Sequence, residues 1–243
     1  MTIVIAHRGA SAYAPENTLK AFSLAADMGA EMSELDVICT NDGKLVVFHD
    51  DTTGRWEDFD HTVRDVTHTH MQTLDIRGEK VPLLAEVLDL ARLRGMRLNV
   101  ELKHAGAAAA VLAAIRDARM IDAVIISSFV PLALHEVRAA DSRIPIAYLM
   151  GSDSWDPLTR LREFWPIPAL QKYNCQAWHP YCALPGVEFS IERVRAAGYA
   201  VNVWTVNDEA LMRRFAHLHV DGIITDAPDV ARGVLASIPP TPK

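Results

Sequence analysis

The sequence lacks a surplus of basic residues. Its 243 residues include 24 Lys and Arg against 31 Asp and Glu, which gives a formal net charge of −7. Nucleic acids and anionic membranes are recognised by clustered positive charge, so a broad binding surface of that kind is not expected. We therefore expect no nucleic-acid partner and no stable membrane association, and any phosphate must be bound locally.

Long apolar runs and ordered cysteine spacings are also missing. No stretch approaches the roughly 18 uninterrupted apolar residues of a membrane span, and the first residues show none of the segments of a secretory leader. Cys39, Cys175 and Cys182 are an odd set at irregular spacing, unlike a disulfide framework or a cysteine-based metal site. We expect a cytoplasmic protein with ordinary thiols, and its oligomeric state is unknown from sequence.

Short apolar runs alternate with amphipathic stretches throughout the chain, a pattern typical of repeated βα units around a parallel sheet. Eight runs are predicted as strands: Ile3–His7, Ser33–Val37, Leu98–Leu102, Ala123–Ser127, Ile144–Met150, Cys175–His179, Val201–Thr205 and Gly222–Thr225. Eight such units predict an α/β fold, a (β/α)₈ TIM barrel that spans residues 1–243 as a single domain. Residues 51–81 interrupt the alternation and are interpreted as a short insertion over the barrel mouth.

Helical patterns lie between the strands, for example at Leu83–Arg94, Ala107–Arg119 and Asp208–His217. The last helix is expected to begin near Asp226-Ala227-Pro228. There Asp226 would be the capping residue and Pro228 would lie in the first turn.

Polar residues end three of the early strands, where barrel active sites lie. They are His7 and Arg8 at the end of the first strand, Glu34 and Asp36 in the second, and Glu101 and Lys103 at the end of the third. Side chains two apart on a strand share a face, so three carboxylates converge if these faces point inward. Such crowding requires a cation, and Mg²⁺ or Ca²⁺ prefers oxygen ligands. Either acidic pair taken alone could instead be solvated or held in a salt bridge.

The sequence between Asp36 and His49 reads as a β-hairpin around Asp42-Gly43, a dipeptide that two-residue type I′ turns favour. Such a turn would place Asp36 opposite His49, with roughly 5 Å between their Cβ atoms. His7 and His49 would then each lie at a strand end near carboxylates. Because imidazole exchanges protons near neutral pH, this placement favours acid–base chemistry over a structural role.

Several motifs occur in an order that resembles the glycerophosphodiester phosphodiesterases. They are His7-Arg8-Gly9, Pro15-Glu16-Asn17-Thr18, Glu34-Leu35-Asp36-Val37, Asp42-Gly43 to His49-Asp50, Val81–Leu88, Asn99–Lys103, Val203–Asn207 and Asp221–Pro228. Each motif is weak alone, but the ordered set spans nearly the whole chain and is specific. The resemblance implies a TIM-barrel hydrolase that splits a glycerophosphodiester into glycerol 3-phosphate and an alcohol.

The resemblance also implies roles for individual residues. It puts the metal on the three carboxylates and makes the two histidines the acid–base pair. Arg8 and Lys103 would lie near phosphate, although either could instead form a salt bridge to Glu34 or Asp36. Trp204 and, more weakly, Phe129 would line the apolar side of the substrate pocket, whereas an aromatic in a strand can also be plain core. Asn17 could help fix the metal or His7, or could cap the following helix.

Three alternatives stay open at this point. A related barrel phospholipase of the C or D type would act on intact lipid, but it needs an apolar rim and the insertion here is polar. A lyase would stop at a cyclic phosphate. A non-catalytic barrel would be expected to lack one of the histidines or carboxylates, and all five are present. Head-group preference and the choice of metal do not follow from the sequence.

Overall fold

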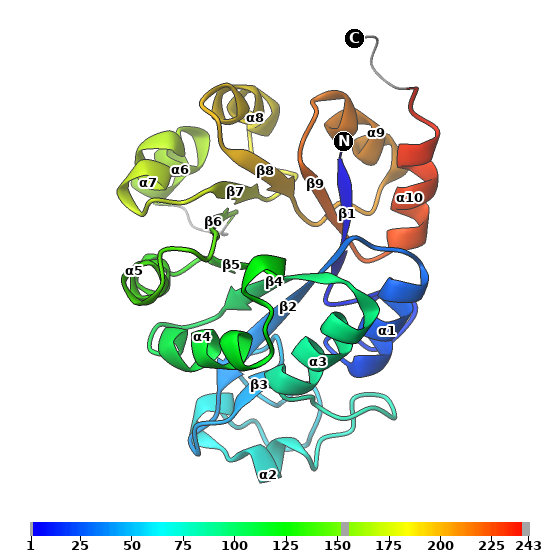
Figure 1. The fold of residues 1–243 in the computed structure, drawn as a ribbon, viewed down its shortest axis with the longest axis vertical. Coiled ribbons are helices and arrows are strands. Elements are labelled where there is room, and N and C mark those ends of the chain that lie inside the picture. The colour runs from blue at the N-terminus through cyan, green and yellow to red at the C-terminus, as the bar shows by residue number, and fades with distance from the viewer. Residues whose placement is uncertain (1, 152–155, 240–243) are drawn as a thin grey trace.

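The computed structural model describes residues 2–151 and 156–239, and in it eight parallel strands close into a barrel surrounded by helices (Figure 1). The strands are β1 (Ile3–His7), β2 (Met32–Cys39), β3 (Leu45–Val47), β4 (Arg97–Leu102), β5 (Val124–Ser128), β6 (Ile146–Met150), β7 (Ala177–Pro180), β8 (Ala200–Val203) and β9 (Gly222–Thr225). They pair in the order β1-β9-β8-β7-β6-β5-β4-β2, β1 also pairs with β2, and β3 adds an antiparallel hairpin to β2. The predicted TIM barrel is confirmed, and its eight strands agree with the expected ranges within two residues at each end.

The helices alternate with the strands along the chain. They are α1 (Leu19–Asp27), α2 (His68–Met71), α3 (Leu84–Arg94), α4 (Ala108–Asp117), α5 (Pro131–Ala140), α6 (Pro157–Phe164), α7 (Ile167–Lys172), α8 (Val187–Ala196), α9 (Glu209–His217) and α10 (Pro228–Ala236), with 3₁₀ turns η1 (Val63–Asp65) and η2 (Ile121–Ala123). The α10 helix begins at Pro228, as expected. The predicted cap is wrong, because Ala227 occupies the capping position and the Asp226 carboxylate bonds elsewhere.

The barrel strands are buried on both faces, as expected of a parallel sheet between helices and an interior. On β1, Val4 packs in the large apolar cluster beneath the helices, whereas Ile5 packs with Met32 of β2 in a separate cluster on the inner face. Side chains alternate along a strand, so His7 shares the inner face with Ile5, and Glu34 shares it with Met32. The strand period therefore directs the polar strand ends toward the barrel interior.

The β2–β3 hairpin differs from the predicted one by one residue. Its loop comprises three residues, 41–43, and ends at Gly43 with φ of 76°, the left-handed position typical of three-residue hairpins. The Phe48 N–H donates to the Asp36 carbonyl at 3.0 Å, so Asp36 lies opposite Phe48 and not opposite His49. The predicted two-residue turn is wrong. His49 lies beyond the end of β3, so strand alternation does not determine the direction of its side chain.

Residues 51–81, called the insertion below, include η1 and α2 and extend beyond β3 at one end of the molecule (Figure 1). A second apolar cluster joins the insertion to the hairpin, with Met71 and Leu74 packing near Val46 and Phe48. From the insertion, Arg55 forms ion pairs with residues beside the barrel mouth. That the insertion covers the mouth stays a prediction.

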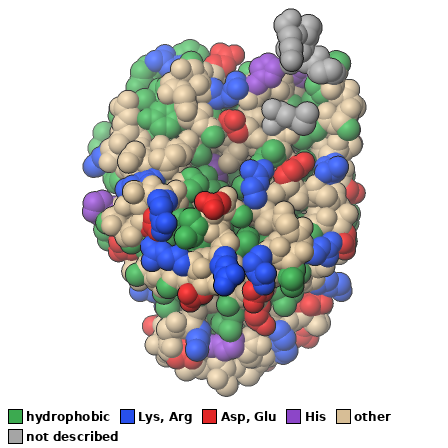
Figure 2. All heavy atoms as spheres, in the orientation of Figure 1, with side chains coloured by type: hydrophobic (Ala, Val, Ile, Leu, Met, Phe, Trp, Pro, Cys, Tyr) green, Lys and Arg blue, Asp and Glu red, His purple; other side chains and the backbone are tan. Residues whose placement is uncertain are grey.

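The surface carries charges of both signs. Basic and acidic side chains are interspersed on the face drawn in Figure 2. No helix in the described ranges is long and apolar enough to cross a membrane. Cys39, Cys175 and Cys182 are free thiols.

Candidate active site

Three buried carboxylates meet where β2 and β4 end. Glu34, Asp36 and Glu101 are 5%, 1% and 8% exposed, and one oxygen from each lies within 4.8 Å of the others. The sheet register explains their approach, because Asp36 pairs with Glu101 and Glu34 lies two residues earlier on the same face. Burial, reinforced by the charge of Asp36, raises the pKa of Glu101 to about 7 and that of Glu34 well above its usual value. Ionisation of all three carboxyls together is therefore unfavourable unless a cation compensates their charge.

Two cations contact this group within the described ranges. Lys103 Nζ lies 3.5 Å from Asp36 Oδ1 and 3.3 Å from Glu101 Oε1, and Arg8 Nε lies 3.3 Å from Asp36 Oδ2. Burial opposes ionisation of Asp36, but Arg8 and Lys103 outweigh it and lower the pKa of that carboxyl. The contact with Asp36 is the salt bridge considered for Arg8 from sequence, and Arg8 Nη1 also lies 3.2 Å from Glu16 Oε1. Glu34 receives the Arg8 backbone N–H at 3.0 Å.

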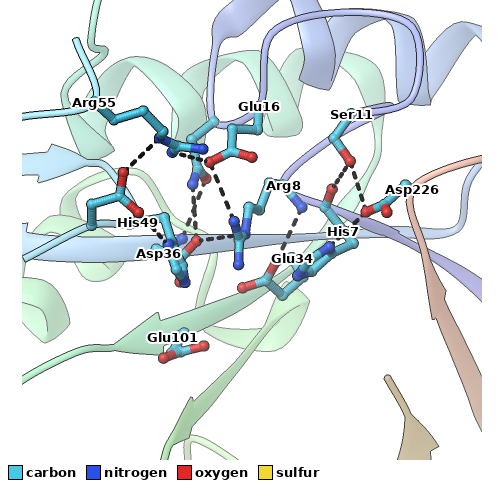
Figure 3. A network of polar contacts seen from close by, with 12 residues as sticks. His7, Arg8, Ser11, Glu16, Glu34, Asp36, His49, Arg55, Glu101 and Asp226 are labelled. Atoms are coloured by element: carbon cyan, nitrogen blue, oxygen red, sulfur yellow. Dashed lines mark hydrogen bonds and ion pairs between the residues drawn. The ribbon is translucent and has the colours of Figure 1, made fainter. Parts of the chain in front are cut away.

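The Asp226 carboxylate orients the His7 ring through Nδ1. The Nδ1 atom lies 2.7 Å from Asp226 Oδ1, and Asp226 also accepts a hydrogen bond from Ser11 Oγ at 2.9 Å (Figure 3). Asn207 Nδ2 donates to the other oxygen of Asp226 at 2.6 Å. Burial opposes ionisation of Asp226. The hydrogen bonds outweigh it, above all the one with His7, and lower the pKa of Asp226 to about 2. An ionised Asp226 keeps a proton on His7 Nδ1, so Nε2 is the nitrogen left to act on a ligand.

His49 has a matching arrangement on the other side of the carboxylates, next to Asp36 in Figure 3. Its Nδ1 lies 2.7 Å from Asp50 Oδ1, and Arg55 Nε lies 2.7 Å from the other oxygen of Asp50. Arg55 also reaches Glu16 at 2.5 Å. Burial lowers the pKa of His49, although Asp36 opposes this shift. Both histidines thus have a carboxylate at Nδ1.

The turn after β1 brings further support to the site. Asn17 Nδ2 donates to Asp36 Oδ2 at 2.9 Å, whereas Thr18 Oγ1 accepts the Ala21 N–H and caps α1. Asn17 therefore orients a carboxylate, and its neighbour is the cap. Gly9 has φ of 80°, and a Cβ there would lie 2.6 Å from the Ala21 backbone carbon, so this turn requires glycine.

Aromatic side chains gather at the same end of the barrel, after β5, β7 and β8. The Trp204 ring lies 5.5 Å from Phe129 and 5.1 Å from Tyr181, centroid to centroid, and its Nε1 donates to the His179 carbonyl at 2.9 Å. Phe129 and Tyr181 are exposed, so Trp204 belongs to an accessible apolar group and not to closed core. Tyr181 was not among the predicted residues.

Sequence reasoning also missed Asp226, Ser11 and Asn207. Asp226 had a usable signal, because it directly follows the apolar β9 at the C-terminal end of a barrel strand. The adjacent Pro228 made helix capping the competing interpretation. Ser11 and Asn207 carried no comparable signal, since each contacts Asp226 only through the folding of separate loops.

The arrangement suits acid–base chemistry on an anionic ligand. A pocket of about 370 Å³ opens beside His7, and its lining comprises His7, Arg8, Ser11, Ala12, Glu16, Asn207, Asp226 and Ala227. The three carboxylates form an oxygen-only donor set, which fits a hard divalent cation. Imidazole, guanidinium and ammonium groups surround that set, so a ligand there would meet both proton carriers and positive charge.

The chain is similar to known proteins in sequence and in fold. A family model described as the glycerophosphoryl diester phosphodiesterase family matches residues 7–230. A glycerophosphodiester phosphodiesterase of Caldanaerobacter subterraneus subsp. tengcongensis is 33% identical over 94% of this chain and 95% of its own. A phosphodiesterase of Oleispira antarctica, solved with its product sn-glycerol-3-phosphate, has a TM-score of 0.83 at 28% identity and covers 98% of both chains. A glycerophosphodiester phosphodiesterase of Thermotoga maritima gives 0.78 at 29%, over 97% of this chain and 98% of that one.

Proposed function

Because the chain belongs to the glycerophosphoryl diester phosphodiesterase family and is a phosphoric diester hydrolase, we propose that it cleaves glycerophosphodiesters by metal-dependent, two-histidine catalysis. The products would be glycerol 3-phosphate and an alcohol. The observation that carries the proposal is the convergence of three buried carboxylates between two carboxylate-oriented histidines. The glycerol 3-phosphate bound to the Oleispira antarctica relative supports this substrate class.

Glu34, Asp36 and Glu101 would hold Mg²⁺ or Ca²⁺. When bound, the cation would compensate the three carboxylates and lower the pKa of a substrate hydroxyl. Arg8 and Lys103 already lie against this group and would bind the phosphoryl oxygens, Arg8 through its planar fork and Lys103 as a point charge. With a net charge of −7, the surface as a whole would not attract phosphate, so Arg8 and Lys103 would bind it locally.

The two histidines would exchange one proton each with the substrate. One imidazole accepts the proton of the glycerol hydroxyl next to the phosphate ester, and that oxygen attacks phosphorus. The other imidazole protonates the departing alcohol, and the product of this step is a cyclic phosphate. Water then opens the ring with the two histidines in reversed roles. An attached hydroxyl has the effective-molarity advantage of an intramolecular nucleophile, although the same residues would also support direct attack by water.

Trp204, Phe129 and Tyr181 would form the apolar wall of the substrate pocket. Their rings lie at the barrel end where the carboxylates lie, and two of them are exposed to solvent. We expect soluble deacylated diesters such as glycerophosphocholine as substrates, with broad head-group tolerance.

Product analysis tests the proposal. Phosphorus NMR of glycerophosphocholine and glycerophosphoethanolamine digests, with Mg²⁺ or Ca²⁺ added, should show glycerol 3-phosphate and free alcohol. Glu101→Gln should remove the activity, whereas Glu192→Gln, on the exposed face of α8, should retain it as the matched control. Cyclic glycerol phosphate as the final product would indicate a lyase. The absence of turnover from correctly folded, metal-supplied protein would contradict the proposal.

A further inference from the structure

The insertion holds a second group of metal-type side chains. Glu57 Oε1 lies 3.1 Å from His61 Nδ1 and 3.0 Å from His70 Nε2, and the three donor atoms lie within 4.8 Å of one another. The two imidazole rings meet edge to face, with centroids 4.9 Å apart. All three side chains are partly exposed, which leaves access for an ion and room for water as a further ligand. None of the three belongs to the carboxylate group at the barrel mouth.

The donor chemistry differs from that of the catalytic group. Imidazole nitrogens favour zinc and neighbouring transition metals, whereas all-oxygen sets favour Mg²⁺ and Ca²⁺. Two ligands about 2.0–2.1 Å from a tetrahedral Zn²⁺ lie roughly 3.3 Å apart, and the observed 3.0 and 3.1 Å approach that spacing. We propose that Glu57, His61 and His70 form a binding site for a zinc-type transition metal ion. Without metal, the same carboxylate oxygen accepts hydrogen bonds from both imidazoles.

The ligands come from two segments whose backbones are fixed separately. Glu57 and His61 lie in a loop closed by backbone bonds, including Thr53 N–H to the His61 carbonyl at 2.9 Å. His70 lies on the short helix α2, whose first turn is capped by Thr67. A shared metal would therefore join the loop to α2 in positions that they already occupy.

Arg55 connects the proposed metal site to the barrel mouth. Arg55 lies two residues before Glu57 and binds Asp50, which in turn contacts His49. A metal that fixes Glu57 would restrict the loop that carries Arg55. The inferred role is structural, a clamp on the insertion, and it does not rest on the catalytic proposal.

Metal analysis of the full chain tests this inference. Metal-stripped protein in excess Mg²⁺ is dialysed against ZnCl₂, and bound zinc and thermal melting are measured. The unmodified chain should bind one more zinc than His61→Ala or His70→Ala, and zinc should raise its melting temperature more. His68→Ala is the matched control, because His68 lies on the same helix but its Nε2 contacts Gln72.

Glu57→Gln serves as the conservative variant and should weaken zinc binding by at least the roughly 10–100-fold typical of losing even an outer-shell partner. Equal zinc content in unmodified, His61→Ala and His70→Ala proteins would overturn the site. Equal loss in His68→Ala would overturn the assignment of these ligands. Because zinc is counted directly, failure of this proposal is distinguishable from failure of the hydrolase mechanism.

Discussion

Replacing Asp226 with Asn tests whether the carboxylate that contacts His7 Nδ1 contributes to catalysis. Asn keeps the size of the side chain but cannot stabilise a positively charged imidazole, and it can present its amide to Nδ1. A hydrogen bond to a charged group contributes about 1.5–3 kcal/mol. If that contribution is made in the transition state, kcat falls roughly 13- to 160-fold, at about 1.36 kcal/mol per factor of ten. Asp226 is 33% exposed, so solvent screening places the expected loss in the lower part of this range.

The assay is initial-rate hydrolysis of glycerophosphocholine across pH, with kcat and KM determined separately. KM should change little, because Asp226 contacts the histidine and not the phosphate-binding cations. Asp229→Asn is the matched control, since Asp229 is exposed and accepts the Tyr13 hydroxyl at 2.7 Å. A kcat of Asp226→Asn equal to that of Asp229→Asn would show that the Asp226 carboxylate has no role in the transition state.

Folding stability gives an independent reading of the same residue. The folded pKa of Asp226 is about 2, below its usual value of 3.8, so the ionised carboxylate stabilises the fold above about pH 4. This contribution is lost as the pH falls through about 2. At neutral pH, Asp226→Asn should lower the free energy of unfolding by about 1–2 kcal/mol after allowance for screening. The difference between the two proteins should shrink on acidification, and a constant difference would show that its origin is not the charge.

Further predictions concern the histidines, the nucleophile and the substrate. His7→Ala and His49→Ala should each lower kcat by about 10²–10⁴-fold with unchanged circular dichroism, and near-normal kcat would return that residue to a structural role. A substrate analogue with propane-1,3-diol in place of glycerol lacks the neighbouring hydroxyl and should bind competitively without turnover; comparable kcat would eliminate the internal nucleophile. Glycerophosphocholine should be preferred over diacyl lipid in vesicles, and a higher kcat/KM for bilayer lipid would favour a phospholipase.

The barrel could be predicted because its signals are local and repeated. Apolar runs at β1 to β9 are buried on both faces, and alternation along β2 and β4 was enough to bring Glu34, Asp36 and Glu101 together. Such residues need only the strand period and the register of neighbouring parallel strands. The carboxylate group was therefore accessible from sequence.

The rest depends on loop geometry, which the strand period does not encode. The hairpin loop has three residues where Asp42-Gly43 favoured two, and the difference alters the partner of Asp36. His49 still lies beside Asp36, but it does so beyond the strand, so a correct placement followed from an incorrect register. Asp226 illustrates a conflict between two local patterns, since a residue before Ala-Pro also resembles a helix cap.

The most direct test of the central claim is the hydrolysis rate of metal-stripped protein before and after a divalent cation is restored. Glu34, Asp36 and Glu101 are buried. In the described ranges, the cations that contact this group are Arg8 and Lys103. We expect negligible release of glycerol 3-phosphate from glycerophosphocholine after stripping, and recovery on addition of Mg²⁺ or Ca²⁺ to the unmodified chain but not to Glu34→Ala. Full activity in thoroughly stripped protein would contradict the central claim.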